Sequence, residues 1–577
     1  MIENKPLTGY PSIDKPWLKY YSEEAINAPL PECSMYEYIW QNNKDHPDDI
    51  ALIFYDKKIT YGEMFKQIDR VAKAFVAAGI KEKDIVTLMM LNQPETVYCI
   101  YALNKIGAVA SVINVLSSPD EIEQYLKENK SDCFVVLDVF FDKCYKAAKN
   151  RGIKSLIWIS LFNSKGLVSK IGYRMKVKAP DCPDDFIVSW NRFIKAGEIV
   201  NELPQIKRNS MEVAMIGHTG GTTGFPKGVL LSNYNYNAVS FQCLKYFNFK
   251  RQDTLLNLIV PHATYGIVVN IHLPLSLGMT TILVPKVDPE HVDDIIVKYR
   301  PNFVPSIPLY WTSVINSKKI SDMSFLKWAS IGGSGISTEQ ITQFNQLAKA
   351  KNSKSQLLIG YGLTETCALI SVQMKGHVAL GSVGFPLPRM VISAFDSETM
   401  EEKRYNQIGE ICITGPSLMI GYLNNENETN AVLEKHNDGR LWLHSGDLGY
   451  VDEKGNVFIQ GRMKRIYLTI MNGLHSKIFP DRIEQALIKQ PDVLECGVIC
   501  VNKGKNVYRP VAFCVLKDSN QSAQNEVEKE LKILAIKELP EYDLPERYVF
   551  CDALPHTSHG KIDYRALEER ATKKAIQ

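Results

Sequence analysis

The stretch HTGGTTGFPKGVLLS, residues 218–232, decides how the rest of the chain is interpreted. A short apolar run directly before it, residues 213–216, predicts a buried strand. Glycines let the following loop approach a ligand closely, threonine hydroxyls can hydrogen-bond phosphate oxygens, and a lysine adds positive charge. The sequence therefore predicts a phosphate-binding loop suited to ATP. Its residues are Thr219, Gly220, Gly221, Thr222, Thr223, Gly224 and Lys227.

This loop differs from the Walker loop of kinases and GTPases, in which the lysine directly follows a glycine and precedes serine or threonine. Here Lys227 lies between Pro226 and Gly228, so the sequence does not support a kinase or GTPase. A Gly/Thr-rich segment by itself is equally consistent with a polar surface loop. The interpretation therefore depends on the motifs elsewhere in the chain.

Size and composition narrow the class of protein. With 577 residues, 45% of them hydrophobic, the chain exceeds one ordinary domain. Its 67 basic and 64 acidic residues give no reason to expect nucleic-acid binding. The twelve cysteines show no CxxC pair, which indicates free thiols in a reducing compartment. The start lacks a signal-peptide core, and no segment reaches the roughly 18 apolar residues of a membrane span. We therefore expect a cytoplasmic protein.

The pattern along the chain predicts two domains. Apolar runs alternate with amphipathic helical segments, as at 85–90 followed by 94–106, which favours α/β layers. A turn and strand signal at 452–460 leads to Gly-Arg-Met-Lys-Arg, and a shorter unit follows with a helix at 481–489 and strands at 495–501 and 510–516. We predict an α/β fold with a large multi-layer N-terminal domain, residues 1–463, and a small α+β C-terminal domain, residues 464–577.

One segment, residues 157–178, is basic, aliphatic and aromatic. Such a surface can touch anionic lipid headgroups weakly or steer an acidic substrate. The alternative is a solvated basic face on a surface excursion. The basic residues are Lys165, Lys170, Arg174, Lys176 and Lys178.

Five further motifs follow the phosphate loop. They are IGGSGIS at 331–337, YGLTET at 361–366, GEICITGPSLMIGYL at 409–423, HSGDLGYVDEKGNVFIQGR at 444–462 and LPHTSHGKIDYRAL at 554–567. With ITYGEMFKQIDRVAKAF from residue 59, they make the chain resemble the adenylate-forming enzyme superfamily. This superfamily includes acyl-CoA synthetases, adenylation domains of peptide synthetases and beetle luciferases. The resemblance covers nearly the whole chain.

The resemblance implies an AMP-forming ligase that uses ATP, Mg²⁺ and coenzyme A. A free carboxylate is a poor electrophile. When one of its oxygens bonds to the α-phosphorus of ATP and pyrophosphate leaves, the product carries AMP as a leaving group that a thiol can displace. This step brings an anion to a polyanion, so it needs fixed positive charge. By resemblance, Lys561 bridges the substrate carboxylate and ATP near the α-phosphate, while Glu365, with Thr222 or Thr223, holds Mg²⁺.

Resemblance also assigns the nucleotide contacts. Asp447 matches the residue that accepts hydrogen bonds from both ribose hydroxyls, and Arg462 matches its forked partner on ribose or phosphate. Tyr361 supplies a flat face against adenine. The remaining predicted contacts with the nucleotide are Gly333, Ser334, Gly335, Gly362 and Thr364.

Lys464 corresponds to the hinge about which a mobile C-terminal domain turns between the two half-reactions. Gly473 is the match to the thiol tunnel. The chain departs from the family at three places: Gly220 replaces a common serine, His556 replaces a common basic residue, and the segment before Pro480 is a few residues longer than usual. The last departure puts the tunnel residues in doubt.

The acyl pocket is expected among segments 262–266, 306–310, 331–335 and 361–367. Its candidate residues are His262, Gly266, Ser306, Gly332 and Cys367. His262 is interpreted either as a gate or as a core histidine. No acidic residue stands between Asp253 and Asp288, so the ammonium of an α-amino acid would lack a counter-charge.

We therefore expect an apolar acid, a medium- or long-chain fatty acid, with aryl acids as competitors. The thiol acceptor is coenzyme A or a carrier protein, which present the same phosphopantetheine arm. A third hypothesis, from another class, is a non-catalytic nucleotide-binding regulator. Retention of Lys561, Glu365, Asp447 and Arg462 argues against it.

Overall fold

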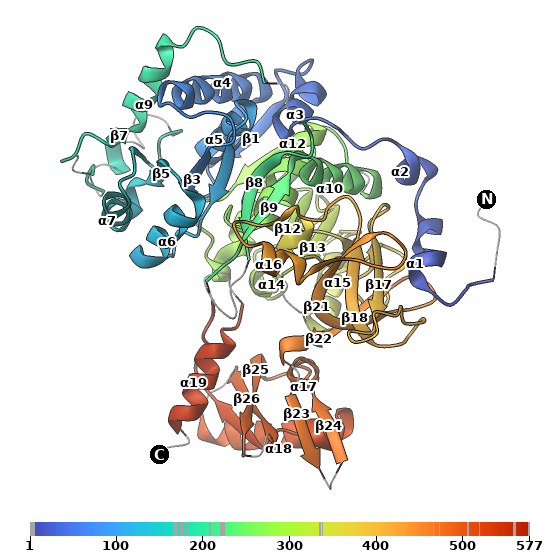
Figure 1. Cartoon of the computed structure of the whole chain (residues 1–577). Coiled ribbons are helices and arrows are strands. Elements are labelled where there is room, and N and C mark those ends of the chain that lie inside the picture. Colours follow the sequence, from blue (N-terminus) through green and yellow to red (C-terminus); the bar gives the residue numbers. More distant parts are fainter. Residues whose placement is uncertain are drawn as a thin grey trace.

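The computed structural model comprises a large body and a smaller C-terminal unit, which Figure 1 draws in orange and red below the body. It describes residues 6–574 apart from 166–170, 174, 176, 181–182, 207–208, 220–224, 248, 334–335, 337, 466, 472–473, 505–506, 518–519 and 558–560. At 464, 468–471, 474–477, 521 and 572–574 it describes the backbone alone.

One large sheet has eight strands within the described residues, and most neighbouring strands are parallel. Its antiparallel edge, β19 and β9, joins the segment after the phosphate loop to a distant part of the chain. In spatial order the strands are β19 (Gly421–Tyr422), β9 (Gly228–Ser232), β8 (Val213–His218), β4 (Val109–Val112), β3 (Ile85–Met89), β5 (Cys133–Leu137), β6 (Ser155–Ile159) and β7 (Ile187–Ser189).

The second large sheet has nine strands in the described chain, again with a parallel centre. In order they are β16 (Phe385–Pro386), β15 (Ser371–Val372), β14 (Leu357–Tyr361), β13 (Trp328–Ile331), β12 (Phe303–Ser306), β10 (Thr254–Asn257), β11 (Thr280–Leu283), β1 (Ile50–Phe54) and β2 (Lys57–Thr60). Parallel strands need crossover connections, and helices supply most of them.

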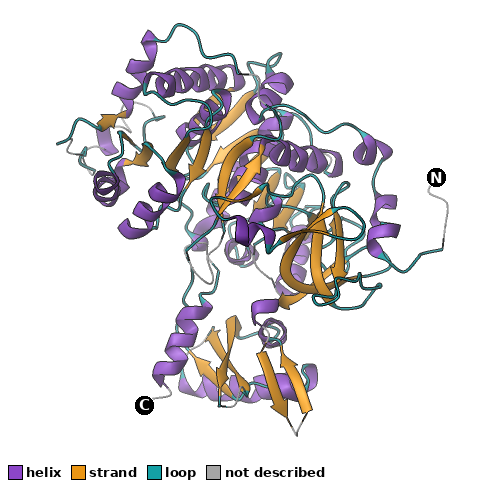
Figure 2. Cartoon of the chain, viewed as in Figure 1, coloured by secondary structure: helices purple, strands orange, loops and turns teal. Residues whose placement is uncertain are grey.

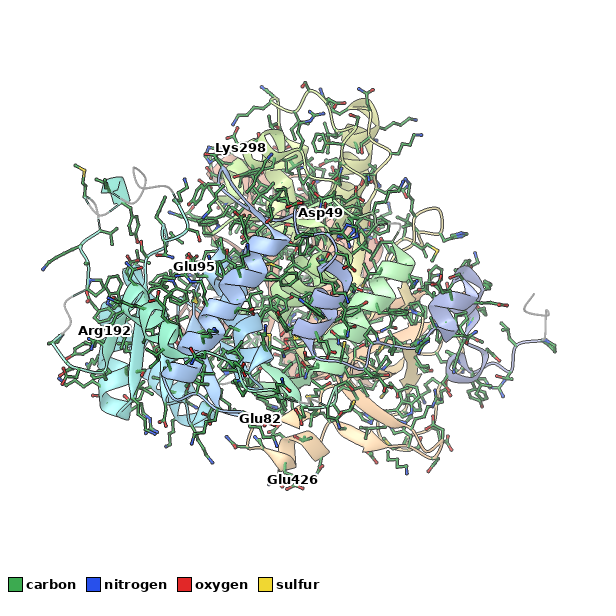
Figure 3. All side chains as sticks on the ribbon, turned by 90° about the horizontal axis from the view of Figure 1, so that it is seen from above. Asp49, Glu82, Glu95, Arg192, Lys298 and Glu426 are labelled. Carbon is green, nitrogen blue, oxygen red and sulfur yellow. The ribbon has the colours of Figure 1, made fainter. Side chains whose placement is uncertain are left out.

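Helices flank both sheets, as Figure 2 shows by colour. Those described in the body are α1 (Pro11–Asp14), α2 (Glu23–Asn27), α3 (Met35–Asn43), α4 (Tyr61–Ala77), α5 (Pro94–Lys105), α6 (Pro119–Asn129), α7 (Phe141–Arg151), α9 (Trp190–Ala196), α10 (Asn233–Tyr246), α11 (Thr264–Ile267), α12 (Leu273–Leu277), α13 (Val292–Tyr299), α14 (Pro308–Ile315), α15 (Thr338–Ala350) and α16 (Glu426–Asn430). In the view from above in Figure 3, Arg192, Lys298 and Glu426 lie at the periphery, while the buried Glu95 lies further in.

Helix α4 illustrates how the sequence sets these elements. Thr60 and Glu63 form a reciprocal capping box that satisfies backbone N–H groups at the helix start. Met64, Ile68 and Phe75 recur at helical spacing and are fully buried. Burying each such side chain stabilises the fold by about 1.5–3 kcal/mol. The capped end and the apolar face together place α4 against the body.

A third sheet in the body carries two of the motifs. Its described strands run in the order β17 (Val391–Phe395), β18 (Gly409–Thr414), β21 (Leu441–Val451) and β20 (Leu433–Lys435), with β22 (Val457–Arg462) also paired to β21. A bulge between Glu410 and Cys412 shifts the β18–β21 register. Asp447 on β21 faces Arg462 on β22 as a direct cross-strand partner.

The C-terminal unit combines two small sheets with helices. These elements are β23 (Tyr467–Met471), β24 (Leu474–Ile478), β25 (Val493–Asn502), β26 (Tyr508–Leu516), β27 (Arg547–Phe550), α17 (Pro480–Leu487), α18 (Gln521–Glu538) and α19 (Tyr564–Lys574). The predicted α/β class, the strands at 213–216 and 85–90, the helix at 94–106 and the C-terminal elements are confirmed. The exact boundary at 463/464 stays a prediction.

No described helix is long and apolar enough to cross a membrane. The segment at 157–178 is not a surface along its whole length, because Ile157 and Ile159 are fully buried in β6. Beyond it Ile171 and Met175 are exposed, and the Lys165 ammonium lies 3.8 Å from the Tyr55 ring centroid. Lys170, Arg174 and Lys176 lie outside the described residues. Lipid contact stays a hypothesis.

Candidate active site

The two large sheets approach each other where the strand before the phosphate loop meets the YGLTET motif. Gly217, at the end of β8, has so little room that a Cβ there would lie 2.5 Å from Thr264 Oγ1 and 3.0 Å from Thr364 Cγ2. Thr364 begins the 3₁₀ helix η6 (Thr364–Thr366), which follows β14 of the other sheet. The phosphate-loop strand therefore abuts the YGLTET motif, and the small size of glycine permits the contact.

The base of the predicted phosphate loop is closed by hydrogen bonds. The Thr219 backbone N–H donates to the Lys227 carbonyl at 3.1 Å, and the Lys227 N–H donates to Thr219 Oγ1 at 3.0 Å. The Lys227 ammonium pairs with Glu428 at 2.5 Å and lies 4.7 Å from the Tyr422 ring centroid. The loop tip, which carries Gly220, Gly221, Thr222, Thr223 and Gly224, lies outside the described residues.

Glu365 lies in η6 and is held from two sides. Tyr422 donates its hydroxyl to Glu365 Oε1 at 2.8 Å, and the Met419 backbone N–H donates to the Glu365 carbonyl at 2.8 Å. A carboxylate is the kind of hard oxygen ligand that Mg²⁺ prefers, so Glu365 fits the predicted metal role chemically. Tyr422 connects Glu365 with Lys227, which lies over the same ring.

Asp447, Arg462 and Tyr361 form a compact polar cluster. Asp447 is buried, and its two oxygens have different partners: Arg462 Nε lies 2.8 Å from Oδ1, and the Tyr361 hydroxyl donates to Oδ2 at 2.5 Å. Burial raises the pKa of Asp447, while Arg462 and Tyr361 oppose that shift. Arg462 also donates to the Ser445 carbonyl at 3.0 Å. These contacts fix the carboxylate that is predicted to bind ribose.

The charges of this cluster influence Lys561 of the C-terminal unit. Desolvation and the positive charge of Arg462 lower the pKa of its ammonium, whereas the carboxylates of Asp447 and Glu365 act in the opposite direction. The charges of the predicted ribose and Mg²⁺ residues therefore affect the pKa of Lys561. Lys561 is an exposed residue, and its carbonyl accepts from the Thr557 N–H at 2.7 Å.

The predicted hinge lies where the chain leaves β22. Lys464 is the middle residue of η7 (Met463–Arg465), and its side chain is outside the described part of the structure, as is Gly473. The neighbouring Arg465 is bound by Asp481 and Glu484 of α17. Asp481 Oδ2 also accepts from the Arg462 backbone N–H at 2.8 Å. Helix α17 is thus tied to both ends of the hinge segment.

The predicted acyl-pocket segments lie next to each other. The Gly332 N–H donates to the Ser306 carbonyl at 3.1 Å, and a Cβ on Gly332 would lie 3.7 Å from the Tyr265 ring. His262 is 4% exposed and Cys367 is fully buried in the left-handed region, with φ +55°. Gly266 packs against the backbone, since a Cβ there would lie 2.4 Å from the Val260 carbonyl oxygen.

The predicted adenine contacts are described in part. Gly333 has φ +85° and an open surrounding, because a Cβ would meet no atom within 4 Å. Ser334 and Gly335 lie outside the described residues. Gly362 follows Tyr361 directly and packs against the loop that returns from Cys367. We therefore expect this loop to depend on the glycine.

Replacing Gly362 by alanine is expected to destabilise the fold by about 1–3 kcal/mol, the usual cost of overpacking. The new Cβ would lie 1.7 Å from the Ala368 carbonyl oxygen and 2.5 Å from its carbonyl carbon, so backbone has to move. Gly332→Ala is the matched control: its Cβ would make ordinary contacts at 3.7 Å, and we expect a change within about 0.5 kcal/mol. Denaturant unfolding measures both. Equal stability of the two variants would contradict this packing.

Three residues of the cluster were missed by the sequence analysis. Tyr422 and Ser445 lie inside the quoted motifs GYL and HSGD, so their positions in these motifs could have indicated them. Ser445 Oγ accepts from the Asp447 N–H at 3.0 Å. Asp481 gave no signal, because its contact with Arg462 arises only when α17 folds against β22.

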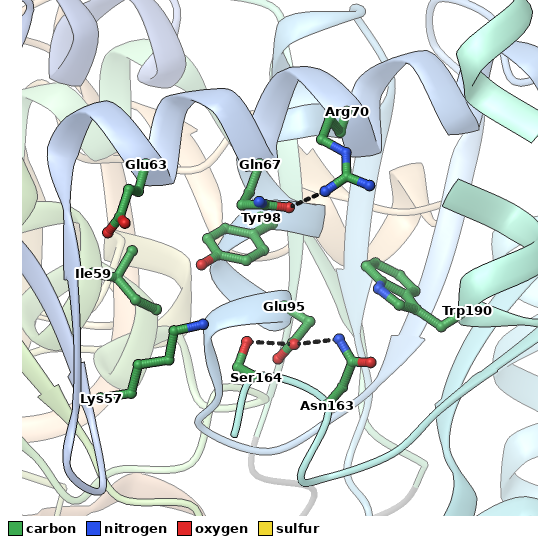
Figure 4. Close-up of a pocket in the computed structure, with 10 residues that line it drawn as sticks. All are labelled: Lys57, Ile59, Glu63, Gln67, Arg70, Glu95, Tyr98, Asn163, Ser164 and Trp190. Atoms are coloured by element: carbon green, nitrogen blue, oxygen red, sulfur yellow. Dashed lines mark hydrogen bonds between the residues drawn. The ribbon is translucent and has the colours of Figure 1, made fainter. Parts of the chain in front are cut away.

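A separate cavity of about 320 Å³ lies beside α4 and α5 (Figure 4). The buried Glu95 lines it and accepts from Asn163 Nδ2 at 2.7 Å and Ser164 Oγ at 2.6 Å. The described residues that line this cavity include none of the predicted site residues. It is therefore distinct from the cluster around Asp447.

Comparison with known proteins identifies relatives along almost the whole chain. The sequence profile described as AMP-binding enzyme matches residues 39–423, and that of the AMP-binding enzyme C-terminal domain matches residues 482–561. The long-chain-fatty-acid–CoA ligase of Bacillus subtilis (strain 168) is 29% identical over 575 residues, which cover 97% of this chain and 98% of that protein. The probable 4-coumarate–CoA ligase 1 of Dictyostelium discoideum is 28% identical over 564 residues, covering 95% and 97%.

A solved structure confirms the fold. The anthranilate CoA ligase AuaEII in complex with anthranoyl-AMP has a TM-score of 0.81 at 20% sequence identity, covering 96% of this chain and 100% of that chain. The likeness extends through the large body with its several sheets and the small C-terminal unit.

Proposed function

Because the chain belongs to the family of AMP-binding enzymes, we propose that it is an AMP-forming ligase that converts a medium- or long-chain fatty acid to its adenylate and then to its coenzyme A thioester. The observation that carries the proposal is that the carboxylates of Asp447 and Glu365, in the body, influence the pKa of the Lys561 ammonium of the C-terminal unit. An adenylation site needs a cation between two anionic reactants, and Lys561 supplies one.

The proposed site residues have different roles in binding the nucleotide, the metal and the acid. Asp447, held by Arg462 and Tyr361, binds the ribose hydroxyls; a carboxylate has lone pairs left after these two contacts. Thr219 and Lys227 position the loop that receives the phosphates. Glu365 holds Mg²⁺, which neutralises phosphate charge when bound. Lys561 then orients the substrate carboxylate at the α-phosphorus and stabilises the charge that develops there.

A fatty acid is favoured by the pocket and by the relatives. The segment between Asp253 and Asp288 offers no acidic counter-charge for an amino-acid ammonium, and the relatives include a long-chain-fatty-acid–CoA ligase. The 4-coumarate–CoA ligases among the relatives support an aryl acid as the second candidate. Coenzyme A is the proposed acceptor, and a carrier protein with the same phosphopantetheine arm is the alternative.

The substrate class is tested by direct detection of product. The protein is incubated with ATP, Mg²⁺ and coenzyme A beside a panel of fatty, aryl and amino acids, and thioesters are identified by mass spectrometry. Fatty acyl-CoA as the main product supports the proposal. An aryl thioester as the main product would show that the substrate is an aryl acid and not a fatty acid. Adenylate without coenzyme A thioester would point to a carrier protein as the acceptor. No adenylate with any acid would favour the non-catalytic regulator.

Lys464→Pro tests the proposed hinge. Proline fixes φ and restricts the residue before it, so rotation about this position is hindered. We expect thioester formation to fall about tenfold or more below its native rate, with a smaller fall in adenylation, because only the second half-reaction requires the rotated arrangement. Single-turnover measurements of adenylate formation and of its consumption by coenzyme A separate the two. Lys464→Ala, which keeps backbone freedom, is the control; equal loss in both half-reactions of the proline variant would refute the hinge.

A further inference from the structure

A group of three metal-binding side chains lies on one face of the sheet that carries Asp447. Glu410 and Cys412 are two residues apart on β18, so both point to the same face, and Cys412 is the cross-strand partner of His444 on β21. His444 Nδ1 lies 2.8 Å from Glu410 Oε2 and 3.5 Å from Cys412 Sγ. The three ligand atoms all lie within 4.8 Å of one another.

This group has the burial and charge of a site for a cation. Cys412 is fully buried, and the side chains of Glu410 and His444 are 9% and 12% exposed. The Glu410 carboxylate supplies negative charge to a bound cation, and a bound cation deprotonates a coordinating thiol.

A second histidine, His436, lies where it can orient the His444 ring by a hydrogen bond. His436 Nε2 lies 3.1 Å from His444 Nε2, on the opposite side of the ring from Glu410 and Cys412. The His436 ring is stacked on Trp442, with centroids 5.5 Å apart, and meets Phe395 edge-on at 4.6 Å. A neutral His436 can accept a hydrogen bond at Nε2. A metal-ligating histidine typically donates its second ring N–H to such an acceptor.

We propose that Glu410 Oε2, Cys412 Sγ and His444 Nδ1 form a Zn²⁺ site, with water as the fourth ligand. Sulfur, imidazole and carboxylate together are the ligands of zinc rather than of Mg²⁺ or Ca²⁺. Binding releases the Cys412 thiol proton to solvent and requires the ring proton that His444 Nδ1 shares with Glu410 to move to Nε2, so that Nδ1 binds the metal and Nε2–H donates to His436. Tetrahedral zinc bonds place nitrogen and oxygen about 3.3 Å apart, so Oε2 has to withdraw by only about 0.5 Å.

The site adjoins the ribose residue without sharing a ligand with it. Glu410 Oε1, the oxygen not assigned to the metal, accepts from the Gly446 N–H at 3.0 Å, and Asp447 follows directly. Monodentate ligation through Oε2 leaves that hydrogen bond in place. Occupancy would therefore stiffen the segment that carries Asp447, and the site can be tested without reference to catalysis.

The test is a titration of the metal-free, nucleotide-free full chain with Co²⁺, which replaces Zn²⁺ and reports sulfur ligation by a thiolate-to-cobalt absorption band. We expect one Co²⁺ per chain with this band, and loss of the band on addition of Zn²⁺. Cys412→Ser is expected to abolish the band, and Cys551→Ser, at a partly exposed cysteine of the C-terminal unit, to retain it.

A second variant covers the case in which Cys412→Ser fails to fold. His436→Phe keeps all three ligands and an aromatic ring against Trp442, and we expect it to retain the band while weakening Co²⁺ binding about 10–100-fold. Absence of a band in the native chain, a band that persists in Cys412→Ser, or unchanged affinity in His436→Phe would each overturn the proposal.

Discussion

Replacing Lys561 by alanine is expected to slow carboxylate-dependent pyrophosphate release by about 10²–10³-fold, the usual cost of removing one preorganised group from a charged transition state. Lys561 of the C-terminal unit is a cation whose pKa is influenced by Asp447 and Glu365. Its loss leaves the substrate carboxylate and the α-phosphate without that positive charge. Because Lys561 is an exposed residue with no hydrogen bond of its side chain among the described contacts, the free energy of unfolding is expected to stay within about 0.5 kcal/mol of the native value.

Lys561→Arg is the control variant, and the quantity compared is kcat/KM as a function of pH. Desolvation and Arg462 lower the pKa of Lys561, so in the free enzyme the cation is present below that pKa and is lost as pH rises through it, earlier than for an ordinary lysine. We expect kcat/KM of the native enzyme to fall on the alkaline side. Arginine stays charged there, so the variant should be slower at neutral pH but lack that fall. The same alkaline fall in both proteins would assign it to another group.

Replacing Asp447 by alanine is expected to raise the KM for ATP by roughly 10²-fold or more. The substitution removes the proposed acceptor for two ribose hydroxyls, and hydrogen bonds to a charged group contribute about 1.5–3 kcal/mol each. It also leaves the Tyr361 hydroxyl and the Arg462 guanidinium without their present partner. Steady-state kinetics with varied ATP, at saturating acid and coenzyme A, measures the change.

Asp447→Asn is the matched variant, because it keeps the shape and one acceptor oxygen but removes the charge. We expect its KM for ATP to lie between those of the native and alanine proteins, and both variants to show a cooperative unfolding transition. A KM for ATP within twofold of native in Asp447→Ala would exclude this residue from the ribose site.

Local patterns predicted the elements, since their causes are local. The apolar run before the phosphate loop became β8, and the helix signal at 94–106 became α5, where Pro94 occupies the first helical position. The motifs HSGD and YGLTET likewise singled out Asp447 and Glu365. Each motif is a run of residues close together in sequence.

The connections inside the site could not be predicted, because their partners lie far apart in sequence. Tyr361 and Asp447 are 86 positions apart, and Tyr422 and Glu365 are 57 apart. Each contact exists only after two sheets have packed together. The grouping of Glu410, Cys412 and His444 also depends on the bulge that shifts β18 against β21.

The measurement that tests the central claim most directly is pyrophosphate release from ATP and Mg²⁺ in the presence of a long-chain fatty acid, with and without coenzyme A, for the native chain and Lys561→Ala. The account predicts release that requires the acid, rises with coenzyme A and falls about 10²–10³-fold in the variant. Release that is independent of the acid, or equal in the two proteins, would contradict it.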